Sequence, residues 1–190
     1  MKKILILDNY DSFTYNLVQI VEELTHQKVD VFRNNEIDLS AIEKYESIIL
    51  SPGPGLPQEA GILKDVIKTY SQSKKIFGVC LGLQAIGEVY NCKLKNLDKV
   101  FHGMATTMYQ TEKNSIIFKD VPKEFIAGRY HSWVIDKTTI DDNLEITSFD
   151  TTKEIMSVEH KLHAVYGVQF HPESILTPEG RTMISNFLSL

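Results

Sequence analysis

The chain has 190 residues, of which 43% are hydrophobic and 24% charged, and its formal net charge is -5. This length favours one domain, residues 1–190, with a substantial core. The mild acidity, together with the lack of any block of lysine and arginine, excludes nucleic acid and an anionic membrane surface as main partners.

The chain contains only two cysteines, Cys80 and Cys92. A secreted domain held together by disulfides would normally carry more of them. The first apolar stretch stops at Leu7, which is too short for the core of a signal peptide, and no later stretch approaches the length of a membrane span. We therefore expect two free thiols and a cytoplasmic protein with no membrane partner.

Short apolar runs alternate with helical patterns through the first ninety residues. The runs predict strands at 3–7, 47–50 and 74–79, an alternating stretch predicts another at 28–32, and the helical patterns predict helices near 13–24, 62–70 and 81–90. Asp11 or Ser12 is available to cap the first of these helices. Strands alternating with helices indicate parallel βαβ units with helices on both faces of a sheet.

The pattern changes to short alternating stretches between about residues 94 and 163. These stretches, at 105–110, 126–135, 144–149 and 155–160, predict antiparallel strands added to one edge or side of the first sheet. A last buried strand at 164–170 and a helix at 178–188 close the chain. The predicted fold is α/β, a central and mostly parallel sheet flanked by helices with an added antiparallel sheet from the second half.

Cys80 stands between Gly78 and Gly82, where a predicted strand turns into a helix. A side chain at such a turn projects above the carboxyl edge of the sheet, where open α/β sheets bind ligands. The two glycines are placed as in the nucleophile elbow of α/β-hydrolases, and the helix N-terminus favours a thiolate. The alternative is a structural cysteine in a turn that needs its glycines only for close packing.

His171 ends the strand 164–170, so it is expected at the same edge of the sheet. Glu173 follows after Pro172, and its carboxylate can hold the imidazole while the other ring nitrogen faces a thiol. The alternative is a helix start that uses Glu173 for its dipole, which leaves His171 without a role. His160 and His163 lie in a charged segment and are expected to be solvated.

The stretch "SPGPG", Ser51–Gly55, follows the predicted strand 47–50 and opens onto the same edge. Glycines at Gly53 and Gly55 allow backbone N–H groups to point into a site, where they can stabilise an oxyanion. The alternative is a rigid turn of proline and glycine. A phosphate-binding loop is disfavoured, because no Gly-Lys-Ser/Thr follows.

Taken together and in this order, "SPGPG", "GVCLGLQ" and "GVQFHPES" resemble the class I, triad-type, glutamine amidotransferases. The resemblance covers essentially the whole chain. The stretches "DNYDSFTYN", "HGMAT" and "GRYHSWVI" are similar to the chorismate-using branch of this family, and most similar to the small subunit of anthranilate synthase.

The resemblance implies a role for each matching residue. Cys80 would be the nucleophile, His171 its base and Glu173 the group that orients the histidine. The N–H groups of Gly53 and Leu81 would form the oxyanion hole. The remaining substrate contacts would come from the backbone loop and from three further positions, with His131 only a structural neighbour: Gly53, Pro54, Gly55, Gln84, Ser132 and Trp133.

The resemblance also implies L-glutamine as substrate and, as partner, a chorismate-binding large synthase subunit, with no metal and no cofactor. The run "DNYDSFTYN" is expected to face this partner or its route for ammonia, with Asp8 and Tyr10 as the positions whose substitution tests this; the alternative is a helix start capped by Asp11 or Ser12. A small subunit of aminodeoxychorismate synthase, which does the same step for folate, stays open; a cysteine is frequent in that branch where this chain has Gly55. An independent thiol hydrolase and a binding module without turnover are further alternatives.

The chain departs from the family in the stretch "VYNCK", where two glycines are usual. Asn91 can adopt the positive φ that a helix-ending glycine would supply. Cys92 is expected to be a small buried apolar residue.

Overall fold

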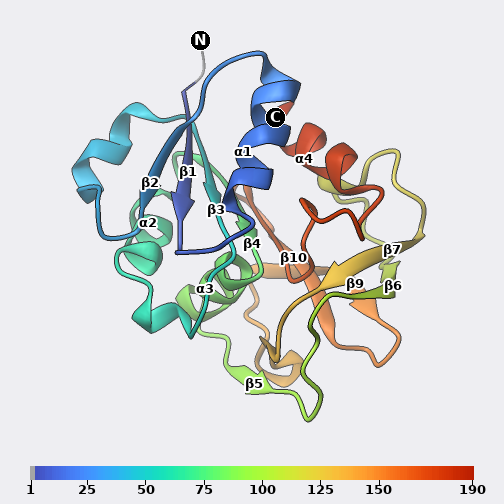
Figure 1. Cartoon of the computed structure of the whole chain (residues 1–190). Helices are drawn as coiled ribbons and strands as arrows, with labels where there is room; N and C mark the ends of the chain where they lie inside the picture. The colour runs from blue at the N-terminus through green and yellow to red at the C-terminus, as the bar shows by residue number, and fades with distance from the viewer. Residues whose placement is uncertain (1–2) are drawn as a thin grey trace.

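The computed structural model describes residues 3–190 and is shown in Figure 1. Four α-helices are found in this part of the chain: α1 (Thr14–Thr25), α2 (Leu63–Tyr70), α3 (Leu81–Val89) and α4 (Gly180–Leu188). The strands are β1 (Ile4–Asp8), β2 (Asp30–Arg33), β3 (Ser47–Leu50), β4 (Lys75–Val79), β5 (Leu94–Asn96), β6 (Met104–Gln110), β7 (Glu124–Arg129), β8 (Trp133–Ile135), β9 (Leu144–Asp150), β10 (Ile155–His160) and β11 (Val165–Val168). Short 3-10 helices lie between them: η1 (Leu39–Lys44), η2 (Pro57–Glu59), η3 (Ile116–Phe118) and η4 (Lys137–Thr139).

Within residues 3–190 the strands form a nine-stranded sheet in the order β2-β1-β3-β4-β11-β10-β9-β6-β7. The strands from β2 to β11 in this order are parallel, which confirms the parallel sheet expected from the first half. The antiparallel strands from β10 to β7 extend the same sheet from its β11 edge. A separate pair, β5 with β8, is also antiparallel.

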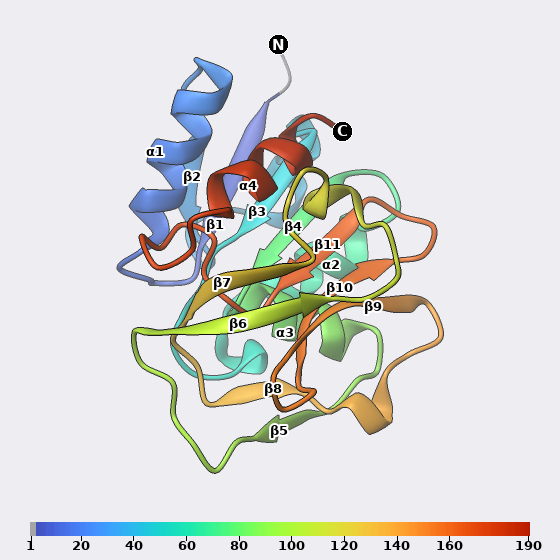
Figure 2. The ribbon, with the colours of Figure 1, turned by 90° about the vertical axis from the view of Figure 1, so that its right-hand side faces the viewer.

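The sheet is covered by helices on both faces, as Figure 2 shows with α4 in front of the strands and α3 behind them. Side chains of β1 alternate between the two layers: Leu5 and Leu7 pack with the buried residues of α2 and α3, and Ile4 and Ile6 pack with those of α1 and α4. Because every residue of β1 is buried, the strand shows the unbroken apolar run of a two-sided core.

The expected strand at 126–135 is divided in the structure. β7 ends at Arg129, and β8 begins at Trp133 in the smaller sheet, where it pairs with β5. The three residues between them leave both sheets and line a pocket near Cys80. The alternating pattern correctly predicted a strand on each side of the break, but it did not indicate that the strand would be interrupted.

The start of α1 also differs from its prediction. Phe13 is the N-cap, and neither Asp11 nor Ser12 caps the helix in the described structure. The Asp11 carboxylate instead accepts a hydrogen bond from the Phe13 N–H at 2.7 Å, inside the turn before the helix. None of the helices between residues 3 and 190 combines the length and apolar character that a membrane crossing requires.

Candidate active site

Cys80 lies at the N-cap of α3, directly after β4. Its φ of 52° and ψ of -99° fall where side-chain-bearing residues are strained, at a cost of roughly 1–3 kcal/mol. A Cβ added to Gly78 would come within 2.6 Å of the Gly82 backbone, and one on Gly82 within 2.7 Å of the Leu50 carbonyl oxygen. The two glycines therefore allow the close strand–helix contact that keeps Cys80 in this conformation.

The loop after β3 lies directly against the start of α3. A Cβ on Gly53 would come within 2.9 Å of Cδ2 of Leu81 and within 2.5 Å of the Asn9 carbonyl oxygen. Leu81 is the first residue of α3, where helical geometry leaves the N–H group without a partner in the helix. The two residues expected to form an oxyanion hole are thus neighbours beside Cys80.

His171 and Glu173 form a close buried pair. Nδ1 of His171 and Oε1 of Glu173 are 2.6 Å apart, and their side chains are 3% and 0% exposed. Within residues 3–190, Nε2 of His171 and Oε2 of Glu173 make no hydrogen bond of ordinary geometry. Nδ1 is therefore the nitrogen that Glu173 engages, and Nε2 is free to exchange a proton.

Cys80 is close enough to His171 to change its acidity. Burial alone lowers the pKa of His171, but Cys80 and Glu173 outweigh burial and raise this pKa to about 11. An imidazole that holds its proton so firmly places a positive charge beside the neighbouring sulfur. The three residues singled out from the sequence therefore meet at one edge of the sheet.

Two aromatic rings contact the imidazole of His171. The Tyr130 ring centroid is 4.7 Å from that of His171, and the Phe13 centroid is 5.7 Å away in an edge-on arrangement. Tyr130 is also tied to the segment after His171, because its hydroxyl lies 3.1 Å from Oγ of Ser174. These contacts restrict the ring of His171 to one orientation.

A pocket of about 170 Å³ opens beside Cys80. It is smaller than the about 300–1,000 Å³ typical of sites for drug-sized ligands, which suits a molecule the size of one amino acid. Leu81 is buried next to this pocket and does not line it. Cys80 lines the pocket, together with Tyr130 and His131, which the sequence did not single out for binding. The rest of the lining consists of the other predicted substrate contacts: Gly53, Pro54, Gly55, Gln84, Ser132 and Trp133.

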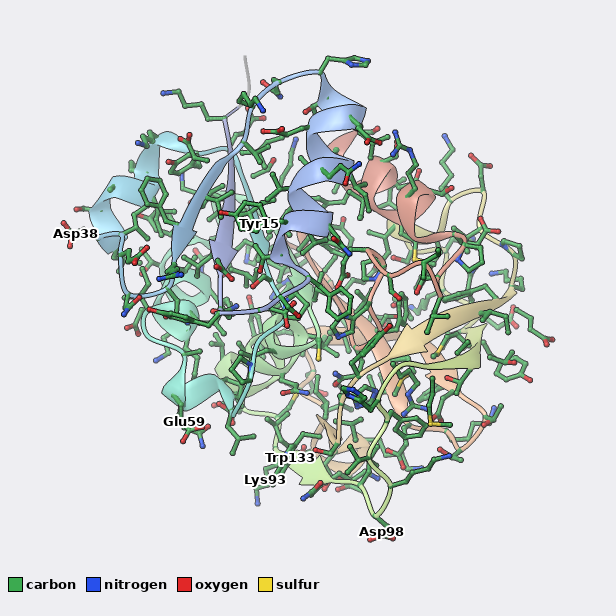
Figure 3. The ribbon with its side chains drawn as sticks, viewed as in Figure 1. Tyr15, Asp38, Glu59, Lys93, Asp98 and Trp133 are labelled. Carbon is green, nitrogen blue, oxygen red and sulfur yellow. The ribbon has the colours of Figure 1, made fainter. Side chains whose placement is uncertain are left out.

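Trp133 lies between two hollows of the surface. One is the pocket beside Cys80, and the other is a neighbouring depression that Lys93 also lines; both residues are labelled in Figure 3. The Trp133 carbonyl oxygen points inward and accepts a hydrogen bond from Nε2 of Gln84 at 3.0 Å. Gln84, predicted as a substrate contact, is thus held from the opposite wall.

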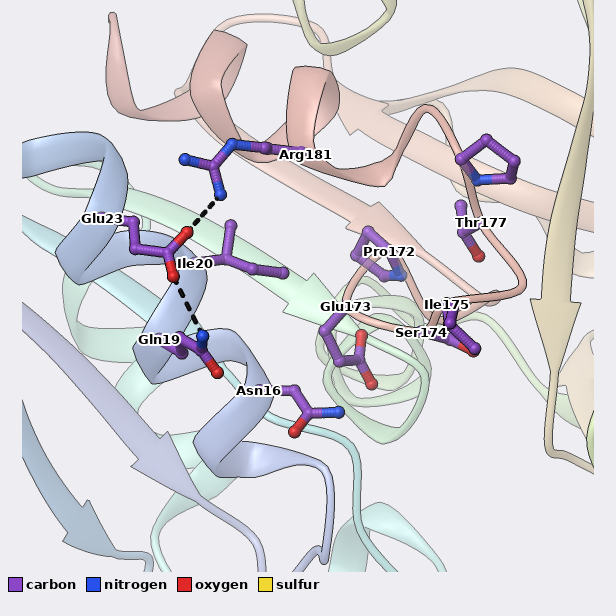
Figure 4. Close-up of a pocket in the computed structure, with 11 residues that line it drawn as sticks. Asn16, Gln19, Ile20, Glu23, Pro172, Glu173, Ser174, Ile175, Thr177 and Arg181 are labelled. Atoms are coloured by element: carbon purple, nitrogen blue, oxygen red, sulfur yellow. Dashed lines mark hydrogen bonds and ion pairs between the residues drawn. The ribbon is translucent and has the colours of Figure 1, made fainter.

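A larger depression of about 470 Å³ lies on the other side of Glu173, between α1 and the segment after His171. Figure 4 shows Glu173 and Ile175 at this depression, with Arg181 reaching across to Glu23 on α1. Arg181 Nη1 and Glu23 Oε2 are 2.6 Å apart. Ile175 is 95% exposed, which is unusual for an isoleucine so near the buried pair of His171 and Glu173.

Asp8 is buried and does not form the exposed contact expected of it. Its Oδ1 accepts hydrogen bonds from Oγ1 of Thr14 at 2.7 Å and from the N–H of Asp11 at 3.2 Å, so Asp8 organises the turn into α1. Tyr10, by contrast, is 49% exposed. Asp8 therefore offers no exposed surface to a partner, whereas Tyr10 does; a place for this run along a route for ammonia stays a prediction.

Asn91, Cys92 and His160 each had an expected conformation or environment. Asn91 has a φ of 63° after α3, and Cys92 is a buried free thiol, as predicted. The expectation that His160 is solvated is wrong: it is buried, and its ring packs against Tyr90 and His163. In the sequence, the charged residues around His160 gave no indication that it packs against Tyr90, at the end of α3.

His131 supports the pocket wall as a neutral ring. Its Nε2 lies 3.1 Å from Nε of Arg129, which can only donate, so Nδ1 carries the proton and donates to the Trp133 carbonyl. Burial, with the charge of Arg129, lowers the pKa of His131 from 6.5 to about 3. This agrees with the expectation that His131 is a structural neighbour.

The buried His131 should make the protein less stable in acid. Between pH 6.5 and about 3, His131 binds a proton in the unfolded chain but stays neutral in the folded protein. The free energy of unfolding therefore falls as the pH drops below 6.5. About two pH units below that point the loss is about 2.7 kcal/mol. Urea unfolding at a series of pH values should give a flatter profile in His131→Gln. The control His26→Gln, at the exposed end of α1, should leave the wild-type slope unchanged; equal slopes in all three proteins would contradict the argument.

Comparisons with known proteins agree with this geometry. Residues 5–190 match the family described as Glutamine amidotransferase class-I. The chain is 46% identical over 188 residues to "Anthranilate synthase component 2" of Lactococcus lactis, covering 98% of this chain and 93% of that protein. It is 42% identical, over an alignment of 193 residues that covers 100% of this chain, to "Bifunctional protein TrpGD" of Thermotoga maritima, but it spans only 32% of that protein. A solved structure from Thermoplasma acidophilum, described as one subunit of a GMP synthase, matches with a TM-score of 0.87 at 25% identity, covering 100% of this chain and 93% of that one.

Proposed function

The chain belongs to the class I glutamine amidotransferases, and from that premise we propose that it hydrolyses L-glutamine and delivers the ammonia to a chorismate-using synthase subunit that makes anthranilate. The observation that carries the glutaminase step is the meeting of Cys80, His171 and Glu173 at one edge of the sheet, beside a pocket for a small ligand. The full-length similarity to anthranilate synthase component 2 supports the choice of product.

In the proposed reaction, the Cys80 thiolate attacks the amide carbon of glutamine. The N–H groups of Gly53 and Leu81 stabilise the oxyanion, and His171 gives its proton to the departing nitrogen, so that ammonia leaves and a γ-glutamyl thioester forms. Water then attacks the thioester while His171 takes a proton from it, the carbon–sulfur bond breaks, glutamate is released, and the thiolate of Cys80 and the charged ring of His171 are restored. Glu173 keeps the imidazole oriented and stabilises its charged form.

The substrate contacts follow from the walls of the pocket. Gly53, Pro54 and Gly55 offer backbone groups on one side, and Ser132 and Trp133 do so on the other. Gln84 reaches the pocket from α3. Because strands from both halves of the chain form one sheet and one pocket, we treat residues 1–190 as a single amidotransferase domain.

The partner is proposed to dock near the exposed aromatic and apolar residues beside the catalytic pair. Tyr15 on α1 is 69% exposed, Ile175 is 95% exposed, and Tyr10, in the turn between β1 and α1, is 49% exposed. Exposed apolar residues grouped around a site are typical of protein–protein contacts. The residues that line the pocket include no lysine or arginine to pair with the two carboxylates of chorismate, which supports the proposal that the partner binds that substrate.

Gly55 gives little help in choosing between anthranilate and aminodeoxychorismate synthesis. Its φ of 72° is a backbone reason for glycine at this position, whatever the pathway. The choice of anthranilate therefore depends on the curated relatives.

Reconstitution with each type of large subunit tests this proposal. We expect glutamine-dependent formation of anthranilate with an anthranilate synthase large subunit, and glutaminase activity that rises when chorismate is supplied together with this subunit. The control is the same mixture supplied with ammonia in place of glutamine. Product formed from glutamine only with the aminodeoxychorismate synthase subunit would reassign the pathway, and no glutamine turnover with either would refute the proposal.

A further inference from the structure

We propose that Gln169 is a catalytic residue that donates a hydrogen bond to the sulfur of Cys80 and stabilises its thiolate form. Gln169 is fully buried just after β11, and its Nε2 lies 3.5 Å from Sγ of Cys80. This inference deepens the proposed function, because it assigns a further group to the same nucleophile. It depends on which end of the Gln169 amide faces the sulfur, and a chain of neighbouring hydrogen bonds decides that.

The chain of hydrogen bonds begins at Arg129. A guanidinium can only donate, so Nε2 of His131, 3.1 Å from Nε of Arg129, must accept. The proton of the neutral ring is then on Nδ1, which lies 3.1 Å from the Trp133 carbonyl oxygen and donates to it. The low pKa of His131, about 3, keeps this arrangement through the working pH range.

The Trp133 carbonyl oxygen has two lone pairs and also accepts from Gln84, whose Nε2 is 3.0 Å away. A carbonyl cannot donate, so the nitrogen of Gln84 must face it. The same nitrogen lies 3.3 Å from Oε1 of Gln169 and donates its second proton there. With its oxygen engaged by Gln84, Gln169 can turn only its nitrogen toward Cys80.

A buried ion pair holds Arg129, where this series of hydrogen bonds begins. Nη1 of Arg129 and Oδ2 of Asp150 are 2.8 Å apart, and both side chains are 2% exposed. Oδ1 of Asp150 accepts two backbone hydrogen bonds, from the N–H groups of Thr152 and Glu154. The guanidinium also lies over the ring of Phe101, with 3.5 Å between its carbon and the ring centroid. Arg129 therefore cannot rotate, and the direction of every later hydrogen bond follows from its position.

A donor aimed at sulfur favours the charged thiolate over the neutral thiol, which accepts hydrogen bonds weakly. The ionisable groups that face Cys80 from other elements are His171 after β11, and His131 and Tyr130 in the segment between β7 and β8. Glu173 and Asp11 interact with His171. Gln169 is uncharged, so its contribution adds a constant stabilisation of the thiolate and does not titrate.

The test is the pH dependence of alkylation of Cys80 by iodoacetamide, followed by mass spectrometry of the Cys80 peptide. Gln169→Met keeps the length of the side chain and removes the donor. We expect the midpoint to rise by about one pH unit, with about tenfold slower alkylation on the acid side. The matched control is Gln110→Met, because Nε2 of Gln110 also donates to two carbonyls, those of Val121 and Pro122, far from the site. This control should keep the wild-type midpoint.

Gln169→Glu, nearly identical in shape, should raise the midpoint further, because a carboxylate near the sulfur repels the thiolate. An unchanged midpoint in a folded Gln169→Met or Gln169→Glu protein would overturn the proposal. In wild-type protein, the side-chain amide protons of Gln169 should shift through the same midpoint in NMR spectra, and constant shifts would overturn it without any variant. Alkylation needs no glutamine, so a raised midpoint in an enzyme without glutaminase activity would refute the proposed function and leave the role of Gln169 standing.

Discussion

Cys80→Ala should reduce glutamine hydrolysis by at least about a thousandfold, because it removes the only atom that can form the thioester. Synthesis from added ammonia by the complex with the large subunit should continue at the wild-type rate, since the partner's own site is untouched. The measurements are glutamate release and product formation with glutamine or with ammonium salt.

Cys92→Ala is the matched control for this experiment. Cys92 is the other buried thiol, and it lies at the end of α3 away from His171. Burial raises the pKa of Cys92, which keeps it protonated and unreactive. Its variant should therefore retain glutamine turnover. Normal turnover in Cys80→Ala, or equal losses in both variants, would end the proposed mechanism.

His171→Asn should lower glutamine turnover by about 10²–10⁴-fold, because no other residue of the pocket can take its place between the sulfur and the leaving nitrogen. Glu173→Gln should be less severe, by roughly tenfold to a hundredfold, since its remaining oxygen can still accept the proton of Nδ1. Both variants should keep ammonia-dependent synthesis. The readout is the steady-state rate of glutamate release from glutamine.

The two variants also differ in their expected pH profiles. Glu173 is one of the groups that raise the pKa of His171, so Glu173→Gln should lower that pKa and move the alkaline limb of the rate profile to lower pH. Glu59→Gln removes a carboxylate from an exposed position beside Gly55 and serves as the control. A loss in Glu173→Gln as large as that in His171→Asn would show that the carboxylate does more than orient and charge the ring.

The meeting of the proposed catalytic residues was predictable from the sequence because each of them follows a buried strand. Apolar runs mark where β3, β4 and β11 end, and parallel strands bring the residues after them to one edge. Gly78 and Gly82 marked the sharp turn, and their missing side chains are required by contacts closer than a Cβ allows.

The pocket wall and the polar chain behind it were much less predictable. Tyr130 and His131 line the pocket because the chain leaves β7 and joins a different sheet, and alternating side chains continue through that break without a signal. Gln169 follows a buried strand like the catalytic residues, and this position was the available clue. Its hydrogen-bond partners Gln84 and Cys80, however, lie 85 and 89 residues away in sequence, so only the folded structure identifies them.

The break between β7 and β8 leaves the proposed reacting residues and one wall of the pocket on different parts of the chain. The proposed reacting residues follow parallel strands, whereas an irregular stretch between the two sheets completes the pocket. Within that stretch Tyr130 contacts His171, and His131 and Trp133 belong to the hydrogen bonds that end at Cys80. Ser132 takes part in neither, so a change at Ser132 can reshape the pocket and leave the sulfur and imidazole in place. Laboratory evolution toward a new nitrogen donor would best start at this position.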